Sequence, residues 1–293
     1  MNDLYFLHYF LSPNQRVFWV YILSSLLIAT VYLYFNPEEK KINMSKTLWL
    51  HQSATLDYRY FIFSFFIKAW LVIPLLIGAN EVMFFTQKLL NDTFGFCAYH
   101  GLSYTEIMVI FTITLFVASD FTRYWLHRFM HTVPLLWKFH KVHHSAKVLT
   151  PITFYRVHPV ENILFGLRFS LTIGLVSGLF LYFFGGLLSF MDVLGINIIV
   201  FSFNIIGSNL RHSHIRLSYF KWIEKILISP FQHQIHHSTT FYNYNFGGYL
   251  AIWDLWFGTL KYSSDVGSMQ FGLKGKNQHK SVLDLLLLRT KND

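Results

Sequence analysis

The chain has 293 residues, of which 53% are hydrophobic, 19% are aromatic and only 13% are Asp, Glu, Lys or Arg. Soluble domains carry about 25% charged residues, so this balance is typical of a membrane protein and excludes a disordered, collagen-like or disulfide-rich chain. The formal net charge is +9. In so apolar a chain, this charge indicates contact with an anionic membrane surface and not nucleic acid binding.

Apolar stretches predict about four or five membrane spans, since about 20 helical residues cross the hydrocarbon core. Three spans are expected near residues 17–35, 60–79 and 104–119. A helical hairpin is expected near 165–210, where Asp192 is the only charged residue after Arg168 and before Arg211. We expect its turn at residues 185–186 or near Asp192. The small residues Gly174 and Gly178 then allow close packing inside the hairpin.

The basic residues predict the orientation of these spans. With the N-terminus outside, 21 of the 24 Lys and Arg residues lie on the cytoplasmic side. Of the other three, Arg16 and Lys88 lie outside and Lys68 lies within a span. Residues 120–168 and 211–293 then share that side, because one hairpin separates them. We therefore predict an all-α, polytopic membrane helix bundle with a cytoplasmic helical cap, in a bacterial inner membrane or the endoplasmic reticulum. It divides into a membrane region, 1–119, and a catalytic region, 120–293.

Histidines gather in the segments predicted to form this cap. The chain has 15 histidines but one cysteine, so a metal would need nitrogen or oxygen ligands. Residues three or four apart share a helix face, and buried imidazoles without a metal would repel one another or leave nitrogens unpaired. The pattern predicts two metals, because one tetrahedral zinc cannot use so many ligands. Three clusters contain eight histidines with this spacing: His127, His131, His140, His143, His144, His233, His236 and His237.

Several sequence blocks around these histidines resemble the fatty acid hydroxylase/sterol desaturase superfamily in order and spacing. The resemblance covers roughly residues 110–260. It is carried by residues 120–131 (DFTRYWLHRFMH), 136–145 (LWKFHKVHHS), 158–161 (HPVE), 210–217 (LRHSHIRL), 229–238 (SPFQHQIHHS), 245–247 (NFG) and 253–259 (WDLWFGT).

This resemblance implies a membrane-embedded, non-haem oxygenase with two iron ions (Fe²⁺). Such an enzyme uses O₂ to hydroxylate or desaturate an unactivated C–H position of a sterol, a fatty acyl chain or a related lipid. Imidazole alone does not select iron over copper, nickel or zinc, but a membrane setting favours oxygen chemistry on lipids. Carried over by motif, the eight clustered histidines are metal ligands and catalytic residues. The family takes one or two further ligands from the block that here holds His212 and His214.

The remaining candidate residues surround this centre. His212 and His214 point to nearly opposite sides of a regular helix, so both are candidate ligands, with His212 the stronger. His158 precedes a proline, which favours an extended backbone, and it is expected to support a ligand or face the substrate. Asp120, Glu161 and Asp254 are candidates to accept the second N–H of a ligating imidazole. Trp125, Trp137 and Tyr155 could form walls of the site.

Each turnover of such an enzyme needs two external electrons. The sequence has no His-Pro-Gly-Gly motif of a fused cytochrome b5 domain, no glycine fingerprint for a flavin or nicotinamide, and no CxxC pair. We therefore expect a separate cytochrome b5, ferredoxin or reductase, docking on the basic cytoplasmic face. An inactive lipid-binding or scaffold protein of the same fold stays an alternative. A metal transporter is less favoured, because Lys68 is the main ionisable residue inside the predicted spans.

Overall fold

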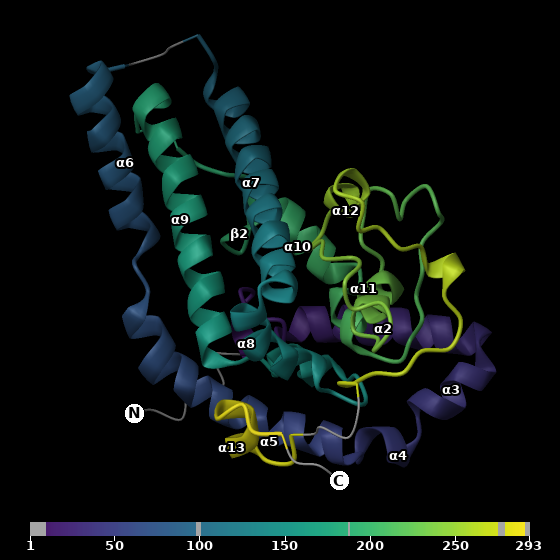
Figure 1. Ribbon diagram of the computed structural model, residues 1–293. Coiled ribbons are helices and arrows are strands. Elements are labelled where there is room, and N and C mark those ends of the chain that lie inside the picture. Colours follow the sequence, from purple (N-terminus) through teal and green to yellow (C-terminus); the bar gives the residue numbers. More distant parts are fainter. Residues whose placement is uncertain (1–9, 98–100, 187, 275–278, 291–293) are drawn as a thin grey trace.

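Three upright helices and a cap at one of their ends make up the computed structural model of the chain (Figure 1). The structure describes residues 10–97, 101–186, 188–274 and 279–290. Helices α6 (Ala79–Phe94), α7 (Tyr104–Thr132) and α9 (Pro159–Phe184) stand side by side. The boundary predicted at residues 119/120 falls within α7, so the two predicted regions share this helix.

Three helical segments among the described residues are long and apolar enough to cross a membrane: Gln52–Phe94, Tyr104–Thr132 and Pro159–Phe184. The first contains α5 (Gln52–Ile67), the π turn η1 (Lys68–Val72), the 3-10 turn η2 (Ile73–Leu75) and α6. Pro74 has no N–H to donate and interrupts the helical hydrogen bonding. The chain bends there, so that α5 runs below the upright helices while α6 stands beside α9 (Figure 1). The predicted span at 60–79 covers this bend.

The predicted span at 104–119 lies within α7 and is confirmed as part of a candidate span. The first predicted span and the predicted hairpin differ from the structure. The helix at the first one, α2 (Trp19–Phe35), has 17 residues and does not stand beside the upright helices but runs across near the lower end of α7 (Figure 1). Two short helices, α3 (Pro37–Asn43) and α4 (Lys46–Trp49), connect it to α5. In the predicted hairpin only α9 is a long helix. Its expected partner is α10 (Ile198–Ile205), whose eight residues extend about 12 Å and cannot cross a bilayer.

The chain returns from the far end of α9 by a different route. A small hairpin of β1 (Asp192–Val193) and β2 (Ile196–Asn197) precedes α10. Two hydrogen bonds attach this segment to the first half of α7: the Met191 N–H donates to Thr112 Oγ1 at 2.8 Å, and Asn197 Nδ2 donates to the Thr112 carbonyl at 2.9 Å. The return brings both histidine-rich parts of the sequence to the same end of the upright helices.

Short helices and turns build the cap at that end. Two aromatic and aliphatic clusters hold it to the longer helices: Tyr124 of α7 packs with Phe246 and Trp253, and Tyr60 of α5 packs with Val142 and Leu285. The cap elements are α8 (Pro134–His144), η3 (Pro151–Tyr155), η4 (Ser208–His212), α11 (Pro230–His236), α12 (Ile252–Trp256), η5 (Ser263–Asp265) and α13 (Val282–Leu286).

Two glycines allow α9 to pack tightly, although against α6 and not within the expected hairpin. A Cβ atom built on Gly174 would lie 2.8 Å from the Ala79 carbonyl oxygen, and one built on Gly178 would lie 2.7 Å from the Met83 carbonyl oxygen. Both obstacles are backbone atoms of α6, which cannot rotate away. The close approach of the two helices therefore depends on the missing side chains.

A single methyl group at this contact should separate the helices. We expect Gly178→Ala to destabilise the protein by about 1–3 kcal/mol, the usual effect of overpacking. Thermal unfolding in detergent would measure it. Gly267→Ala is the matched control, because nothing lies within 4 Å of a Cβ atom at that position. Equal melting temperatures for the two variants would contradict the packing described here.

Candidate metal centre

The end of α7 and the whole of α8 bring the first histidines together. A capping box between Ser103 and Glu106 starts α7, and Pro134 starts α8 two residues after α7 ends. The tight connection folds α8 back, so that the ring centroids of His131 and His140 lie 4.7 Å apart. In α11, a second capping box, Ser229 with Gln232, fixes the helix that carries the last cluster.

Nine histidines form two groups, each with ligand atoms within 4.8 Å of one another. Both groups mix residues from the two halves of the region 120–293, so neither half forms the centre alone. The first contains His127, His131, His140, His144 and His236, and the second contains His143, His212, His233 and His237.

Hydrogen bonds fix the proton position on four of these rings. Carbonyl and carboxylate oxygens only accept, so the nitrogen that contacts them carries the proton and leaves Nε2 with a lone pair. The Nδ1–H groups donate as follows: His127 to the Phe246 carbonyl at 2.8 Å, His236 to the Tyr244 carbonyl at 2.8 Å, His143 to the Arg156 carbonyl at 3.2 Å, and His140 to Glu161 Oε1 at 2.9 Å.

The nitrogens directed inward fit metal ions. Among the described residues, Nε2 of His140 and of His236 and both ring nitrogens of His131 and His144 are buried without a hydrogen-bond partner. In the second group the Nε2 atoms of neighbouring rings lie 3.2–3.3 Å apart, and each set of inward lone pairs needs a common partner. Metal ions would use these lone pairs, and ligands whose other nitrogen is held by the protein are typical of metal sites.

Burial keeps these imidazoles neutral. It lowers the pKa of His140 to about 3 and that of His143 to about 4, in the second case against the opposing effect of Glu161. Burial and neighbouring imidazoles also hold the pKa of His144 and His237 well below the usual value. Only the neutral ring offers a lone pair, so both groups are in the ligating form at neutral pH.

Asp254 stabilises the loop that holds His127. Its carboxylate accepts hydrogen bonds from the backbone N–H groups of Phe246 and Gly247, both at 2.8 Å, and from Thr259 Oγ1 at 2.6 Å. Burial raises the pKa of Asp254 to about 7 in spite of these donors. A Cβ atom at Gly247 would lie 2.4 Å from the Leu250 carbonyl oxygen, so the loop requires glycine there. Asp254 thus acts on His127 through the Phe246 carbonyl, not by direct contact.

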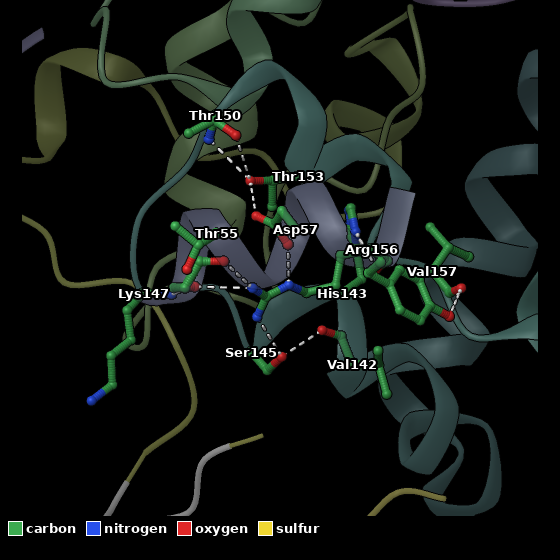
Figure 2. Close-up of polar contacts among 12 residues, drawn as sticks. Thr55, Asp57, Val142, His143, Ser145, Lys147, Thr150, Thr153, Arg156 and Val157 are labelled. Carbon is green, nitrogen blue, oxygen red and sulfur yellow. Dashed lines mark hydrogen bonds and ion pairs between the residues drawn. The ribbon is translucent and has the colours of Figure 1, made fainter. Parts of the chain in front are cut away.

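A buried ion pair that the sequence analysis missed supports His143 (Figure 2). Arg156 is 1% exposed and its Nε donates to Asp57 Oδ1, while Thr153 Oγ1 donates to Asp57 Oδ2 at 2.7 Å. The guanidinium also donates to the Ser53 carbonyl at 2.7 Å. This network fixes the backbone of Arg156, whose carbonyl accepts from His143. The sequence signal for this pair is Asp57 itself, a carboxylate just before the predicted span at 60–79, where a charged residue needs a partner.

Three predicted residues lie elsewhere. His214 is outside both groups, and its Nε2 accepts from the Leu149 N–H at 3.2 Å. His158 caps α9 through Nδ1 and donates from Nε2 to the Leu286 carbonyl. Asp120 accepts from the Tyr249 and Leu250 N–H groups and from Trp253 Nε1, without contacting an imidazole. Of the three carboxylates, Glu161 alone directly accepts from a histidine of the two groups.

A cavity of about 380 Å³ opens onto both groups of histidines. Its wall includes His127 and His140 from the first group and His143, His212 and His233 from the second. Of the aromatic residues considered above, Tyr155 lines this cavity, Trp137 packs on His131 with centroids 5.0 Å apart, and Trp125 packs on Phe257. A substrate in the cavity would therefore lie beside both candidate metal positions.

Comparison with known proteins places these residues in a family context. Residues 111–259 match the family described as fatty acid hydroxylase. Alkylglycerol monooxygenase of Danio rerio is 33% identical over 51% of this chain and 30% of its own length. Lathosterol oxidase of Mus musculus is 24% identical over 61% and 52%, and the very-long-chain aldehyde decarbonylase CER1 of Arabidopsis thaliana is 29% identical over 50% and 22%. The chain therefore spans about half or less of these relatives. No solved structure matches it.

The buried ion pair gives the first test of this arrangement. We expect Asp57→Asn to destabilise the protein by about 3–5 kcal/mol, because Arg156 would keep a buried and unpaired charge. Thermal unfolding in detergent measures the change. Asp265→Asn removes an exposed carboxylate and should leave the melting temperature unchanged. A melting temperature for Asp57→Asn equal to that of the control would refute the role of the pair.

The lowered pKa values predict a pH dependence for the metal-free protein. Below about pH 6.5 the unfolded chain binds protons on its histidines, whereas the folded chain does not until about pH 4 for His143 and about pH 3 for His140. Stability should therefore fall as the pH falls through this range. Chemical unfolding of chelator-treated protein at several pH values measures it, with metal-loaded protein as the control. A flat profile for the metal-free sample would contradict neutral, buried imidazoles.

Proposed function

Because the chain belongs to the fatty acid hydroxylase family, we propose that it is a membrane-bound, non-haem di-iron oxygenase that hydroxylates or desaturates a lipid. The observation that carries this proposal is the pair of histidine groups, all neutral through burial, opening onto one cavity. The names of two relatives, alkylglycerol monooxygenase and lathosterol oxidase, support oxygen chemistry on lipids. The substrate would be a sterol, a fatty acyl chain or a related lipid.

Two iron ions would be held by the nine histidines of the two groups. His214 is left out of this ligand set, since its Nε2 accepts from a backbone N–H. When bound, the irons supply O₂ activation and the removal of hydrogen from an unactivated C–H bond. The protein's part is to hold the rings: Glu161 and three backbone carbonyls keep the Nδ1 protons in place, so that the Nε2 lone pairs point inward.

The cavity would position the lipid and limit access by water. Phe61 of α5, Phe154 of η3 and Phe165 of α9 line it, and α5 and α9 belong to candidate spans, so a lipid could enter from the bilayer. Apolar walls around a reacting carbon keep bulk water away from the reaction site. Whether the product is an alcohol or an alkene depends on where the second hydrogen lies relative to the irons.

Electrons would come from a separate donor: a cytochrome b5, a ferredoxin or a reductase. A second cavity of about 250 Å³ supports this, because Lys141 and Lys274 line it together with His144, a ligand in the proposed first group. Trp137 and Tyr242 stack in its wall with centroids 5.4 Å apart, and Trp137 lies 5.6 Å from the His144 ring. A basic rim suits an acidic donor, and the aromatic pair would connect the surface with the metals.

The histidine end of the molecule would face the cytoplasm, in a bacterial inner membrane or the endoplasmic reticulum. The distribution of Lys and Arg supports this orientation. A metal transporter fits the geometry less well, since both groups form where the candidate spans meet the cap, whereas transporters hold their cargo near the membrane centre. An inactive scaffold of the same fold predicts metal-free protein and unchanged lipids.

Metal analysis with lipid mass spectrometry tests the proposal. We expect about two irons per chain in the purified protein and, in cells that carry the gene, a lipid that differs by one oxygen or two hydrogens. His236→Ala should lose iron and abolish the lipid change, because it removes an inward Nε2.

The matched control is His214→Ala, which removes a half-buried histidine outside both groups and should keep its iron. Protein that folds but binds no metal, with no change in cellular lipids, would refute the oxygenase and favour the scaffold. Equal loss of iron in both variants would refute the ligand assignment.

A further inference from the structure

Five cationic side chains line the same cavity as the histidines. They come from different elements: the segment before α2, η1, α7, α9 and η4. Glu161 is the one carboxylate of the cavity wall among the described residues, and it already accepts a hydrogen bond from His140. The cations are Arg16, Lys68, Arg123, Arg168 and Arg211.

Within the described chain none of the four arginines forms a hydrogen bond with a charged group. Arg168 donates to the Ser119 carbonyl at 2.8 Å and to Thr122 Oγ1 at 2.9 Å, Arg211 donates to the Gly248 carbonyl, and Arg16 donates to Ser208 Oγ. Arg123 has no hydrogen bond or ion pair to a described residue, and its guanidinium lies 5.9 Å from the Phe165 ring. Asp120 lies near Arg123 and Arg168, but its oxygens already accept three other hydrogen bonds.

The environment of these arginines differs from that of Arg156, the one other deeply buried guanidinium of the described chain. Arg156 has a carboxylate partner, Asp57, in direct contact. In the cavity, the Nε atoms of Arg168 and Arg211 are buried and find no hydrogen-bond partner in the described chain, and Arg211 is 7% exposed. Each guanidinium has five N–H donors, and a buried charge without a counterion is costly. The cavity wall thus carries five cationic side chains against a single carboxylate among the described residues.

We propose that this cavity binds an amphiphile with an anionic head group, a carboxylate or a phosphate, and that such a lipid is the substrate. The inference rests on the proposed function and names its substrate class. Guanidinium groups match the planar or tetrahedral oxygens of these anions and bind them with charge-assisted hydrogen bonds.

The other walls of the cavity specify an amphiphile and not a free anion. Phe61, Phe65, Phe154 and Phe165 line it together with the arginines, so one ligand meets both aromatic rings and cations. The volume of about 380 Å³ is within the usual range for small-molecule sites and is enough for a head group with the first part of its chain. Histidines of both groups share the wall, which brings the bound lipid next to the proposed irons.

Matched lipid probes test the proposal on iron-loaded protein in detergent. Oleate is compared with oleyl alcohol, and lysophosphatidate with monooleoylglycerol, so each pair differs in head-group charge while keeping a similar chain. Titration calorimetry or native mass spectrometry measures the binding, and iron content is measured on the same samples. We expect one anion to bind at least about tenfold more tightly than its neutral partner, a difference typical of a charge-assisted contact. The pair that shows the preference identifies the head group as carboxylate or phosphate.

Variants then assign the preference to the arginines. Arg123→Gln should reduce it about tenfold, and this change breaks no hydrogen bond to the described chain. Arg123→Lys should keep part of it, and Arg168→Gln is a second, independent removal of charge. Arg59→Gln removes an exposed arginine outside the cavity and should have no effect.

Failure of this inference is distinguishable from failure of the proposed function. Protein that retains two irons but binds each anion no better than its neutral partner overturns the anionic substrate and leaves the oxygenase intact. A preference for the anionic probe that survives in both Arg123→Gln and Arg168→Gln also overturns the proposed anionic substrate. Protein that prefers the anion but holds no iron supports the lipid site and refutes the di-iron function.

Discussion

Nine imidazoles must be buried together with their lone pairs facing inward, and the rest of the cap is arranged around this constraint. An imidazole has two nitrogens, so an acceptor on the opposite side of the ring holds the proton and leaves the inward lone pair free. The chain supplies such acceptors for four of the nine rings: one carboxylate, Glu161, and three backbone carbonyls. Burial then keeps the rings neutral, which is the state that a metal requires.

The use of backbone carbonyls explains why residues far from the histidines matter to the centre. A carbonyl is only as well placed as the segment that carries it. The segment at Arg156 is fixed by the buried Asp57, and the one at Phe246 by the buried Asp254. Asp57 lies on α5, outside the catalytic region predicted from the sequence, so the membrane part and the histidine centre form a single packed unit.

The spacing of the histidines was sufficient to predict the clusters, because residues three and four apart share a helix face in α7, α8 and α11. Whether His212 or His214 joins the clusters was harder to predict. The 3-10 turn η4 ends at His212 and Ser213 is extended, so the two side chains leave the backbone in different directions. Hydropathy found the apolar stretches but not their shape: it could not distinguish a second spanning helix from the β1–β2 hairpin and the short α10. The carbonyl acceptors leave no pattern in the sequence, since any residue has one.

Charge balance connects the histidine centre to the cavity beside it. Each carboxylate near the centre already has a partner: Glu161 accepts from an imidazole through Oε1, Asp254 and Asp120 accept from backbone N–H groups, and Asp57 pairs with Arg156. No cavity arginine forms an ion pair with a carboxylate of the described chain, and two bound iron ions would add further positive charge. An anion at this position must come from outside the described chain. A lipid that carries it would neutralise the cavity and lie beside the proposed metals in one binding event, so the charge of the site would select the substrate of the proposed oxygenase.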